Sequence, residues 1–208
     1  MTVALVPWLI ASYLLGSIPT SYLAARYGAG VDLRQVGSRN LGATNLYRVL
    51  GWRYAVPVAV FDAAKGAVPV LLFSRLAAVG VWGALALGLA AILGHVFSVF
   101  LRFKGGKGVA TSAGVVLGLA PLAFLAAGIV WALVVRVSGY VSLGSILAAL
   151  AFPAGVAILY PGRREVLWFG LVLAALIVGF HRANIARLLR GTESRFGRRT
   201  PEDAETAP

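Results

Sequence analysis

The stretch of this sequence best suited to bind an anion is a short run of glycine and lysine in the middle of the chain, which we call the glycine-lysine loop. Its members are Lys104, Gly105, Gly106, Lys107 and Gly108. Glycine permits positive φ angles and close backbone approach, so consecutive N–H groups can form an anion-binding nest. A helix is expected directly after the loop, and its N-terminal dipole favours the same anion. The loop differs from a Walker A motif, which requires Ser or Thr after the lysine. The alternative is a flexible basic turn whose lysines serve only topology.

A second polar stretch, residues 37–48, is rich in uncharged hydrogen-bonding side chains and arginine. Its candidate ligand-binding residues are Ser38, Asn40, Thr44, Asn45 and Arg48. Asn, Ser and Thr often bind their own backbone in turns, which is the structural alternative. Arginine, in contrast, is suited to bidentate phosphate contacts, and Asp32 is the only acidic residue nearby. The composition is that of a site for an anion.

A third polar stretch, residues 181–193, combines a histidine with amide and cationic side chains. His181, Asn184 and Arg187 are spaced three apart and therefore lie roughly on one helix face. A lone histidine at a membrane edge is more often a structural residue than a catalyst, and Asn184 is what strengthens the functional interpretation. Ser142 and Ser145, at the start of an apolar segment, are further candidates at the same face.

Two charges lie inside an apolar segment. A charge at the bilayer centre costs about 2.5–3.5 kcal/mol on insertion scales. Asp62 and Lys65 are three residues apart and can pair, so we interpret them as a structural ion pair rather than as substrate contacts. His95 ends the next apolar segment beside the glycine-lysine loop and is interpreted as an orienting residue.

Several kinds of chemistry are not supported by the residues present. The chain has no cysteine and two histidines, so we expect no thiolate nucleophile, no metal site and no cofactor. Paired carboxylates near the loops and a Gly-x-Ser-x-Gly elbow are also missing, which argues against a hydrolase. The net charge of +12 fits lipid attraction and the positive-inside bias. Nucleic-acid binding is not expected, because the basic residues lie in short loops.

The elements that must position these residues are membrane-spanning helices. The chain is 60% hydrophobic and 12% charged, against about 25% charged in soluble domains. Four long runs carry no Asp, Glu, Lys or Arg, and each exceeds the roughly 20 residues a helix needs to cross a bilayer. The expected apolar segments are 3–25, 54–74, 77–100, 109–135, 140–160 and 165–181. The sequence therefore predicts an all-α polytopic bundle, one domain over residues 1–199, with a polar, frayed tail over 200–208.

The positive-inside rule sets the orientation. The loops 26–53 and 102–107 and the segment after 181 are rich in Arg and Lys, so all three are expected in the cytoplasm. Six crossings cannot satisfy this with an outside N-terminus. Pro121 disfavours helix at the residue before it, and we expect a break there into helices 109–120 and 121–136. The prediction is about seven crossings, N-terminus out and C-terminus in, with all three polar stretches at the cytoplasmic face.

The motifs resemble, in order along nearly the whole chain, a known family: the bacterial membrane glycerol-3-phosphate acyltransferases that use acyl-phosphate. The matching stretches are residues 16–19, 37–48, 62–66, 94–111, 142–145 and 181–193. The resemblance implies seven crossings, an active site at the cytoplasmic face of the bacterial cell membrane, and transfer of an acyl chain to the 1-hydroxyl of glycerol 3-phosphate. Lysophosphatidic acid and phosphate would be the products, in phospholipid synthesis.

The resemblance also implies roles for individual residues. Ser38 and Arg48 match essential residues of the first motif, and the glycine-lysine loop matches the glycerol-phosphate loop, with Lys107 its principal cation. His181 and Asn184 match polar substrate contacts, Ser142 and Ser145 lie in a substrate-lining segment, and Glu193 matches a structural residue. Two positions depart from the family pattern, because Arg39 stands where many relatives have Gly and Ser98 where Pro is common.

The resemblance implies acyl-phosphate and glycerol 3-phosphate as substrates, membrane lipid as surroundings, and the enzyme that makes acyl-phosphate as a candidate partner. The chain is compatible with a monomer. The alternative function is an organic-phosphate transporter, which also needs cationic groups and broken helices. Transporters place their site near the midplane between repeated halves, whereas the polar residues here gather at one face.

Overall fold

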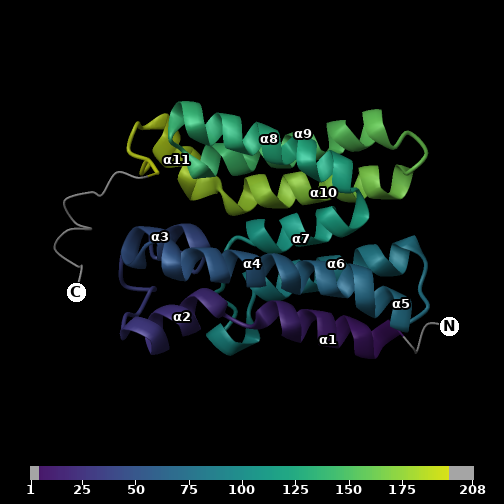
Figure 1. Cartoon of the computed structure of the whole chain (residues 1–208), viewed down its shortest axis with the longest axis horizontal. Coiled ribbons are helices and arrows are strands. Elements are labelled where there is room, and N and C mark those ends of the chain that lie inside the picture. Colours follow the sequence, from purple (N-terminus) through teal and green to yellow (C-terminus); the bar gives the residue numbers. More distant parts are fainter. Residues whose placement is uncertain (1–4, 197–208) are drawn as a thin grey trace. The chain divides into compact units, whose positions relative to one another are not determined.

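The computed structural model describes residues 5–196, and every regular element within that range is helical (Figure 1). The α-helices are α1 (Leu5–Ser17), α2 (Thr20–Ala29), α3 (Ala43–Leu50), α4 (Trp52–Val68), α5 (Ser74–Leu76), α6 (Val81–Val96), α7 (Val109–Leu119), α8 (Pro121–Ser138), α9 (Val141–Leu159), α10 (Arg164–Phe180) and α11 (Arg182–Leu189). A π-helical segment, Pro69–Phe73, joins α4 to α5, and a 3₁₀ turn, Val99–Leu101, follows α6. The predicted all-α membrane fold is confirmed.

The described residues divide into two compact units, residues 5–115 and residues 116–196. In the first unit, α1 packs along α6, and α3 packs on α4. In the second, α9 packs between α8 and α10. The single domain expected over residues 1–199 stays a prediction, and the predicted tail, 200–208, lies outside the described residues.

Four helical stretches are long and apolar enough to cross a membrane: Trp52–Leu76, Val81–Leu101, Pro121–Ser138 and Val141–Leu159. The bent pair formed by α10 and α11, with a 60° angle between them, adds a fifth. Two further apolar helices are shorter than a full crossing. Helix α1 has 13 residues, and α7 has 11. The count of seven crossings therefore stays a prediction.

The apolar segment expected over residues 3–25 is not one continuous helix. The helix stops at Ser17 and restarts at Thr20, because Pro19 has no N–H with which to continue the ladder. Side chains from elsewhere in the first unit supply donors to the backbone at this break. The Ser98 hydroxyl donates to the Ser17 carbonyl at 2.5 Å, and Lys65 Nζ donates to the Ile18 carbonyl at 2.8 Å. An interrupted helix is tolerated inside a membrane when neighbouring side chains satisfy the freed groups in this way.

The predicted break at Pro121 is confirmed. Helix α7 ends at Leu119 and α8 begins at Pro121, with Ala120 between them in an extended conformation (φ −149°, ψ 77°). The guanidinium of Arg163 donates to the Leu119 carbonyl at 2.8 Å, and the Tyr160 hydroxyl accepts the N–H of Leu122 at 3.1 Å. The break is thus capped from the loop between α9 and α10.

Glycines let helices of the first unit touch backbone to backbone. A Cβ at Gly16 would collide with the Ala91 carbonyl, and one at Gly94 with the Tyr13 carbonyl, so α1 lies flush against α6. Helix α7 meets α4 in the same way. A Cβ at Gly66 or Gly114 would overlap the backbone of the facing helix. Small residues at helix interfaces permit this close packing. These contacts fix the end of α6 and the start of α7, which are the two supports of the glycine-lysine loop.

Candidate active site

The glycine-lysine loop folds back onto the end of α6. The N–H of Gly105 donates to the Val96 carbonyl at 2.9 Å, and the N–H of Gly106 donates to the His95 carbonyl at 3.1 Å. Both donors are therefore directed at the helix rather than at an open cradle. The predicted nest, in which these two N–H groups would bind phosphate, is wrong in this respect. The glycines are needed for close approach instead, because a Cβ at Gly105 would collide with the His95 carbonyl.

The end of the loop lies at the start of α7. Gly108 is buried with φ +75°, a conformation that glycine adopts without strain, and α7 starts immediately afterwards. Lys107 is half-buried, and Lys104 is exposed. The first N–H groups of a helix have no intrahelical partner, and the helix dipole adds positive potential there. The loop thus brings one half-buried lysine to a helix N-terminus.

The second polar stretch, residues 37–48, is organised around Asn45 on α3. Its side-chain oxygen accepts the N–H of Ser38 at 2.8 Å, while its Nδ2 donates to the carbonyls of Leu33 and Val36 at 3.4 and 3.2 Å. Asn45 is completely buried, so the side chain holds the preceding loop against α3. Ser38, in contrast, is exposed. Arg48 lies one turn further along α3 on the same face as Asn45, and it is half-buried.

The second polar stretch and the glycine-lysine loop lie against each other within the first unit. A Cβ at Gly106 would collide with the Leu41 carbonyl, so the two segments touch there. Beneath the contact, Leu41 packs with Leu33, Leu46 and Val58 in a buried apolar cluster to which Leu101 adds its side chain. The structure therefore brings together two of the stretches that the sequence singled out, which carry Ser38, Asn40, Thr44, Asn45, Arg48, Lys104 and Lys107.

Arg39 adopts a left-handed backbone conformation. It has φ +56°, and it follows Gly37 with φ +57° and exposed Ser38. Glycine adopts such angles freely, whereas other residues are strained there. The position demands a left-handed conformation, which explains why glycine suits it.

The predicted pair of Asp62 and Lys65 is present and deeply buried. Lys65 Nζ lies 2.8 Å from Asp62 Oδ1, with side-chain exposures of 1% and 2%. The Thr20 hydroxyl donates to the same oxygen at 2.5 Å, and His95 Nδ1 lies 3.9 Å from it. Because Lys65 also caps the break at Pro19, the pair has a structural task. We call Thr20, Asp62, Lys65 and His95 the buried cluster.

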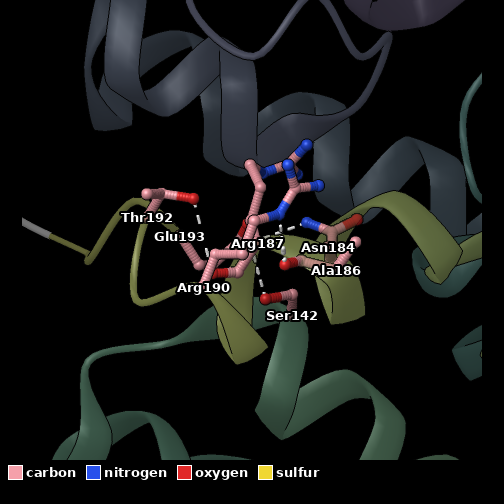
Figure 2. Close-up of polar contacts among 7 residues, drawn as sticks. All are labelled: Ser142, Asn184, Ala186, Arg187, Arg190, Thr192 and Glu193. Carbon is pink, nitrogen blue, oxygen red and sulfur yellow. Dashed lines mark hydrogen bonds and ion pairs between the residues drawn. The ribbon is translucent and has the colours of Figure 1, made fainter.

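In the second unit, Glu193 gathers the polar side chains of the third stretch (Figure 2). Its carboxylate accepts hydrogen bonds from the Ser142 hydroxyl at 2.6 Å, from Asn184 Nδ2 at 2.6 Å and from Arg187 Nε at 2.7 Å. Burial raises the pKa of Glu193, but the three hydrogen bonds outweigh it, and the pKa lies below its ordinary value. Glu193 thereby ties the chain after α11 to the start of α9.

The other candidates of the second unit are bound to their own helices. His181, at the junction of α10 and α11, is buried, and its Nδ1 lies 2.8 Å from the Ile177 carbonyl. Since a carbonyl only accepts, Nδ1 carries the proton in this contact, which makes Nε2 the acceptor in the neutral ring. The Ser145 hydroxyl donates to the Val141 carbonyl at 2.9 Å. Within residues 5–196, no group of three or more His, Asp or Glu side chains is arranged to hold a metal ion.

Comparison with known proteins decides the family. A profile described as "Glycerol-3-phosphate acyltransferase" matches residues 6–191. The chain belongs to the glycerol-3-phosphate acyltransferase family. It is 53% identical over 186 residues to the glycerol-3-phosphate acyltransferase of Desulforudis audaxviator, covering 89% of this chain and 92% of the relative. It is 49% identical over 190 residues to that of Geotalea daltonii, covering 91% and 96%.

The same family is found among solved structures. The chain is similar to an integral membrane glycerol 3-phosphate acyltransferase in its glycerol 3-phosphate form, with 43% identity, a TM-score of 0.86, and coverage of 93% and 96% of the two chains. The lysophosphatidic acid form gives 40% identity, a TM-score of 0.84, and coverage of 97% and 98%. Membership in an acyltransferase family confirms the resemblance stated from the sequence and does not favour the organic-phosphate transporter.

Sequence reasoning missed the contacts of two residues in the first unit. Thr20 contacts Asp62, and Ser98 caps the break in the first helix. The sequence signal for these contacts was Pro19. Proline has no N–H to donate, so carbonyls in the preceding turn need hydrogen-bond donors from other segments. No sequence pattern predicts that Arg187 pairs with Glu193. The two residues are six apart, and α11 ends between them, so helical periodicity does not apply.

Proposed function

We propose that this protein transfers an acyl chain from acyl-phosphate to the 1-hydroxyl of glycerol 3-phosphate. The products are 1-acyl lysophosphatidic acid and inorganic phosphate. The observation that carries the proposal is the pairing, within the first unit, of the Ser38–Arg48 segment with the glycine-lysine loop. This pairing gathers cationic and hydroxyl side chains against a helix N-terminus in a part of the chain with few acids, which suits two phosphate-bearing substrates.

The reaction needs no covalent enzyme intermediate. Acyl-phosphate is a mixed anhydride, so phosphate is already a good leaving group. The hydroxyl oxygen of glycerol 3-phosphate attacks the acyl carbonyl carbon, the bond between that carbon and the phosphate oxygen breaks, and the hydroxyl proton passes to the departing phosphate. Lys107 and Arg48 neutralise the phosphate charges and align the two substrates, while Ser38 offers an exposed hydroxyl to them.

The base is proposed to be the phosphate of the donor, with His181 as the alternative. His181 is buried and uses Nδ1 on its own helix, which favours the phosphate as the base. His181 and Asn184 are assigned to substrate contact on the family resemblance. His181→Ala is then expected to raise the KM for glycerol 3-phosphate more than it lowers kcat. A loss confined to kcat, with both Michaelis constants unchanged, would instead identify His181 as the base.

Some of the proposed ligand contacts are assigned by how exposed they are. Thr44, Asn40 and Lys104 are half-buried or exposed and are retained as substrate-lining residues. Ser142 and Ser145 are buried and are retained on the family resemblance alone. Asn45 is assigned to positioning, because its amide is buried against the backbone of the loop. Gly105, Gly106 and Gly108 shape the loop, and Glu193, Asp62 and Lys65 are structural.

The protein is proposed to lie in the bacterial cell membrane, with seven crossings, the N-terminus outside and the active-site segments facing the cytoplasm. Labelling of Gly162→Cys by an impermeant thiol reagent tests the topology. Labelling from the outside is expected, and labelling only from the cytoplasmic side would contradict it. Substrate supply makes the enzyme that produces acyl-phosphate a proposed partner.

A donor panel tests the reaction. Purified protein is mixed with labelled glycerol 3-phosphate and with acyl-phosphate, acyl-CoA or acyl-carrier protein in separate reactions. Labelled lysophosphatidic acid is expected from acyl-phosphate only. Product from acyl-CoA or acyl-carrier protein at an equal rate would overturn the assigned donor, and no product from any of them would overturn the transferase reaction.

A further inference from the structure

The glycine-lysine loop rests directly on the imidazole of His95. A Cβ built on Gly106 would collide with His95 Nε2, so the α-carbon of that glycine lies against the edge of the ring. The His95 carbonyl accepts the N–H of Gly106, and the Val96 carbonyl accepts the N–H of Gly105. The backbone and the side chain of His95 therefore both determine how closely the glycine-lysine loop packs on the end of α6.

The other ring nitrogen, Nδ1, faces Asp62, another member of the buried cluster. His95 Nδ1 lies 3.9 Å from Asp62 Oδ1, and Nδ1 is buried without a hydrogen-bond partner among the residues described. Asp62 itself is held by the Thr20 hydroxyl and by Lys65. A carboxylate at that distance favours the ring orientation that turns Nδ1–H toward it, which leaves Nε2 turned toward the loop. The charged pair inside the first unit and the substrate loop are thus joined through a single side chain.

We propose that His95 is a positioning residue that fixes the glycine-lysine loop for glycerol 3-phosphate, and that Asp62 sets its orientation. The structural task of Asp62 and Lys65 at the Pro19 break accounts for their pairing with each other. It does not account for a histidine beneath the loop that approaches the same carboxylate oxygen, Asp62 Oδ1. This inference rests on the proposed function, because the loop is taken to hold glycerol 3-phosphate.

Amide hydrogen exchange tests the positioning without any substrate. In His95→Ala the space beneath Gly106 opens, and the amides of Gly105 and Gly106 are expected to exchange about tenfold faster than in the wild type. Ser74→Ala is the matched control, since it removes another buried side chain of the first unit, one that donates to the Val70 carbonyl away from the loop. Unchanged exchange at the two glycines in His95→Ala would overturn the inference, even if the protein proves to have no transferase activity.

Steady-state kinetics separate loop positioning from a general loss of stability, because a loss of stability does not change the KM for one substrate alone. His95→Ala is expected to raise the KM for glycerol 3-phosphate about tenfold, with the KM for acyl-phosphate nearly unchanged. Equal losses for both substrates, or a fall in kcat alone, would contradict a role in holding the loop. Wild-type protein without activity would count against the proposed function only.

Two conservative variants keep the test informative if His95→Ala does not fold. Asn places its amide near the position of Nδ1, and Gln reaches the position of Nε2. His95→Gln is expected to restore slow exchange at Gly106 better than His95→Asn, because Gln fills the space beneath the glycine. The reverse order would overturn the assignment of Nε2 to the loop.

Discussion

Two carboxylates organise the two units of the chain, and they do so in different surroundings. Asp62 lies within a 25-residue apolar helical stretch, where it shares one oxygen between Lys65 and Thr20. Glu193 lies after α11 and distributes both oxygens among Ser142, Asn184 and Arg187. The side chain of Arg187 is 38% exposed, whereas that of Lys65 is 1% exposed.

The difference teaches what each carboxylate is for. A fully buried cation needs its counter-charge, since leaving one ion of such a pair alone costs about 3–5 kcal/mol. A half-exposed arginine keeps its contact with water, so Glu193 matters more for the geometry it imposes on Ser142 and Asn184. We therefore expect Asp62 to govern whether the first unit folds, and Glu193 to govern how the third polar stretch is arranged.

Removing the buried counter-charge is expected to have the largest effect. Asp62→Asn leaves Lys65 charged and buried, and should lower the free energy of unfolding by about 3–5 kcal/mol. The unfolding midpoint in detergent measures it. The double variant Asp62→Asn/Lys65→Met, which removes both charges, should recover a large part of this loss. A single variant as stable as the wild type would show that the two carboxylates do not differ in this way.

Replacing the carboxylate of the second unit is expected to have a smaller effect on stability. Glu193→Gln weakens three hydrogen bonds, at a cost of about 1–3 kcal/mol. It should also change the pH dependence. Because the pKa of Glu193 is lower in the folded protein than its ordinary value of 4.5, its contribution is complete above that pH and is lost as the pH falls below it.

Unfolding midpoints measured from pH 7 down to pH 3 should therefore fall for the wild type below about pH 4.5 and converge with those of Glu193→Gln. Ser142→Ala is the matched control, since it removes one donor and keeps the carboxylate. Parallel curves for the wild type and Glu193→Gln would contradict the assigned hydrogen bonds.

The smallest effect is expected at a half-buried carboxylate whose partner is exposed, since the side chain of Asp32 is 14% exposed and that of Arg34 is 53% exposed. Asp32 pairs with Arg34 at 2.7 Å on the surface of the first unit, and the hydrogen bond from Arg34 lowers the pKa of Asp32 to about 2. Solvent screens such pairs, so Asp32→Asn should leave the unfolding midpoint at pH 7 unchanged within error. If Asp32→Asn lowered the unfolding midpoint as much as Asp62→Asn does, burial would not explain the difference between the two ion pairs.

The sequence predicted the helical class, the break at Pro121 and the pairing of Asp62 with Lys65, because each rests on local chemistry. Charge-free runs of sufficient length specify spans, and proline specifies a break. The same rule applied to Pro19 would have divided the first helix, yet the apolar run around it suggested continuity.

The arrangement of the site was less predictable. Three glycines in four residues indicate close approach of backbone, but they do not reveal what approaches. Here the neighbour is the end of α6, so the N–H groups of Gly105 and Gly106 bind its carbonyls. Asn45 binds the backbone of the loop just before α3, and His95 lies against Gly106, which follows it in the next loop; such contacts follow from how the chain folds back on itself rather than from any local motif.

The central claim is that the glycine-lysine loop holds glycerol 3-phosphate. Equilibrium binding of labelled glycerol 3-phosphate to the purified protein, without acyl donor, tests it most directly. We predict saturable binding by the wild type, a loss of at least about tenfold in affinity for Lys107→Met, and wild-type affinity for Arg53→Gln, an exposed cation on α4. Equal affinity of Lys107→Met and the wild type would contradict the account.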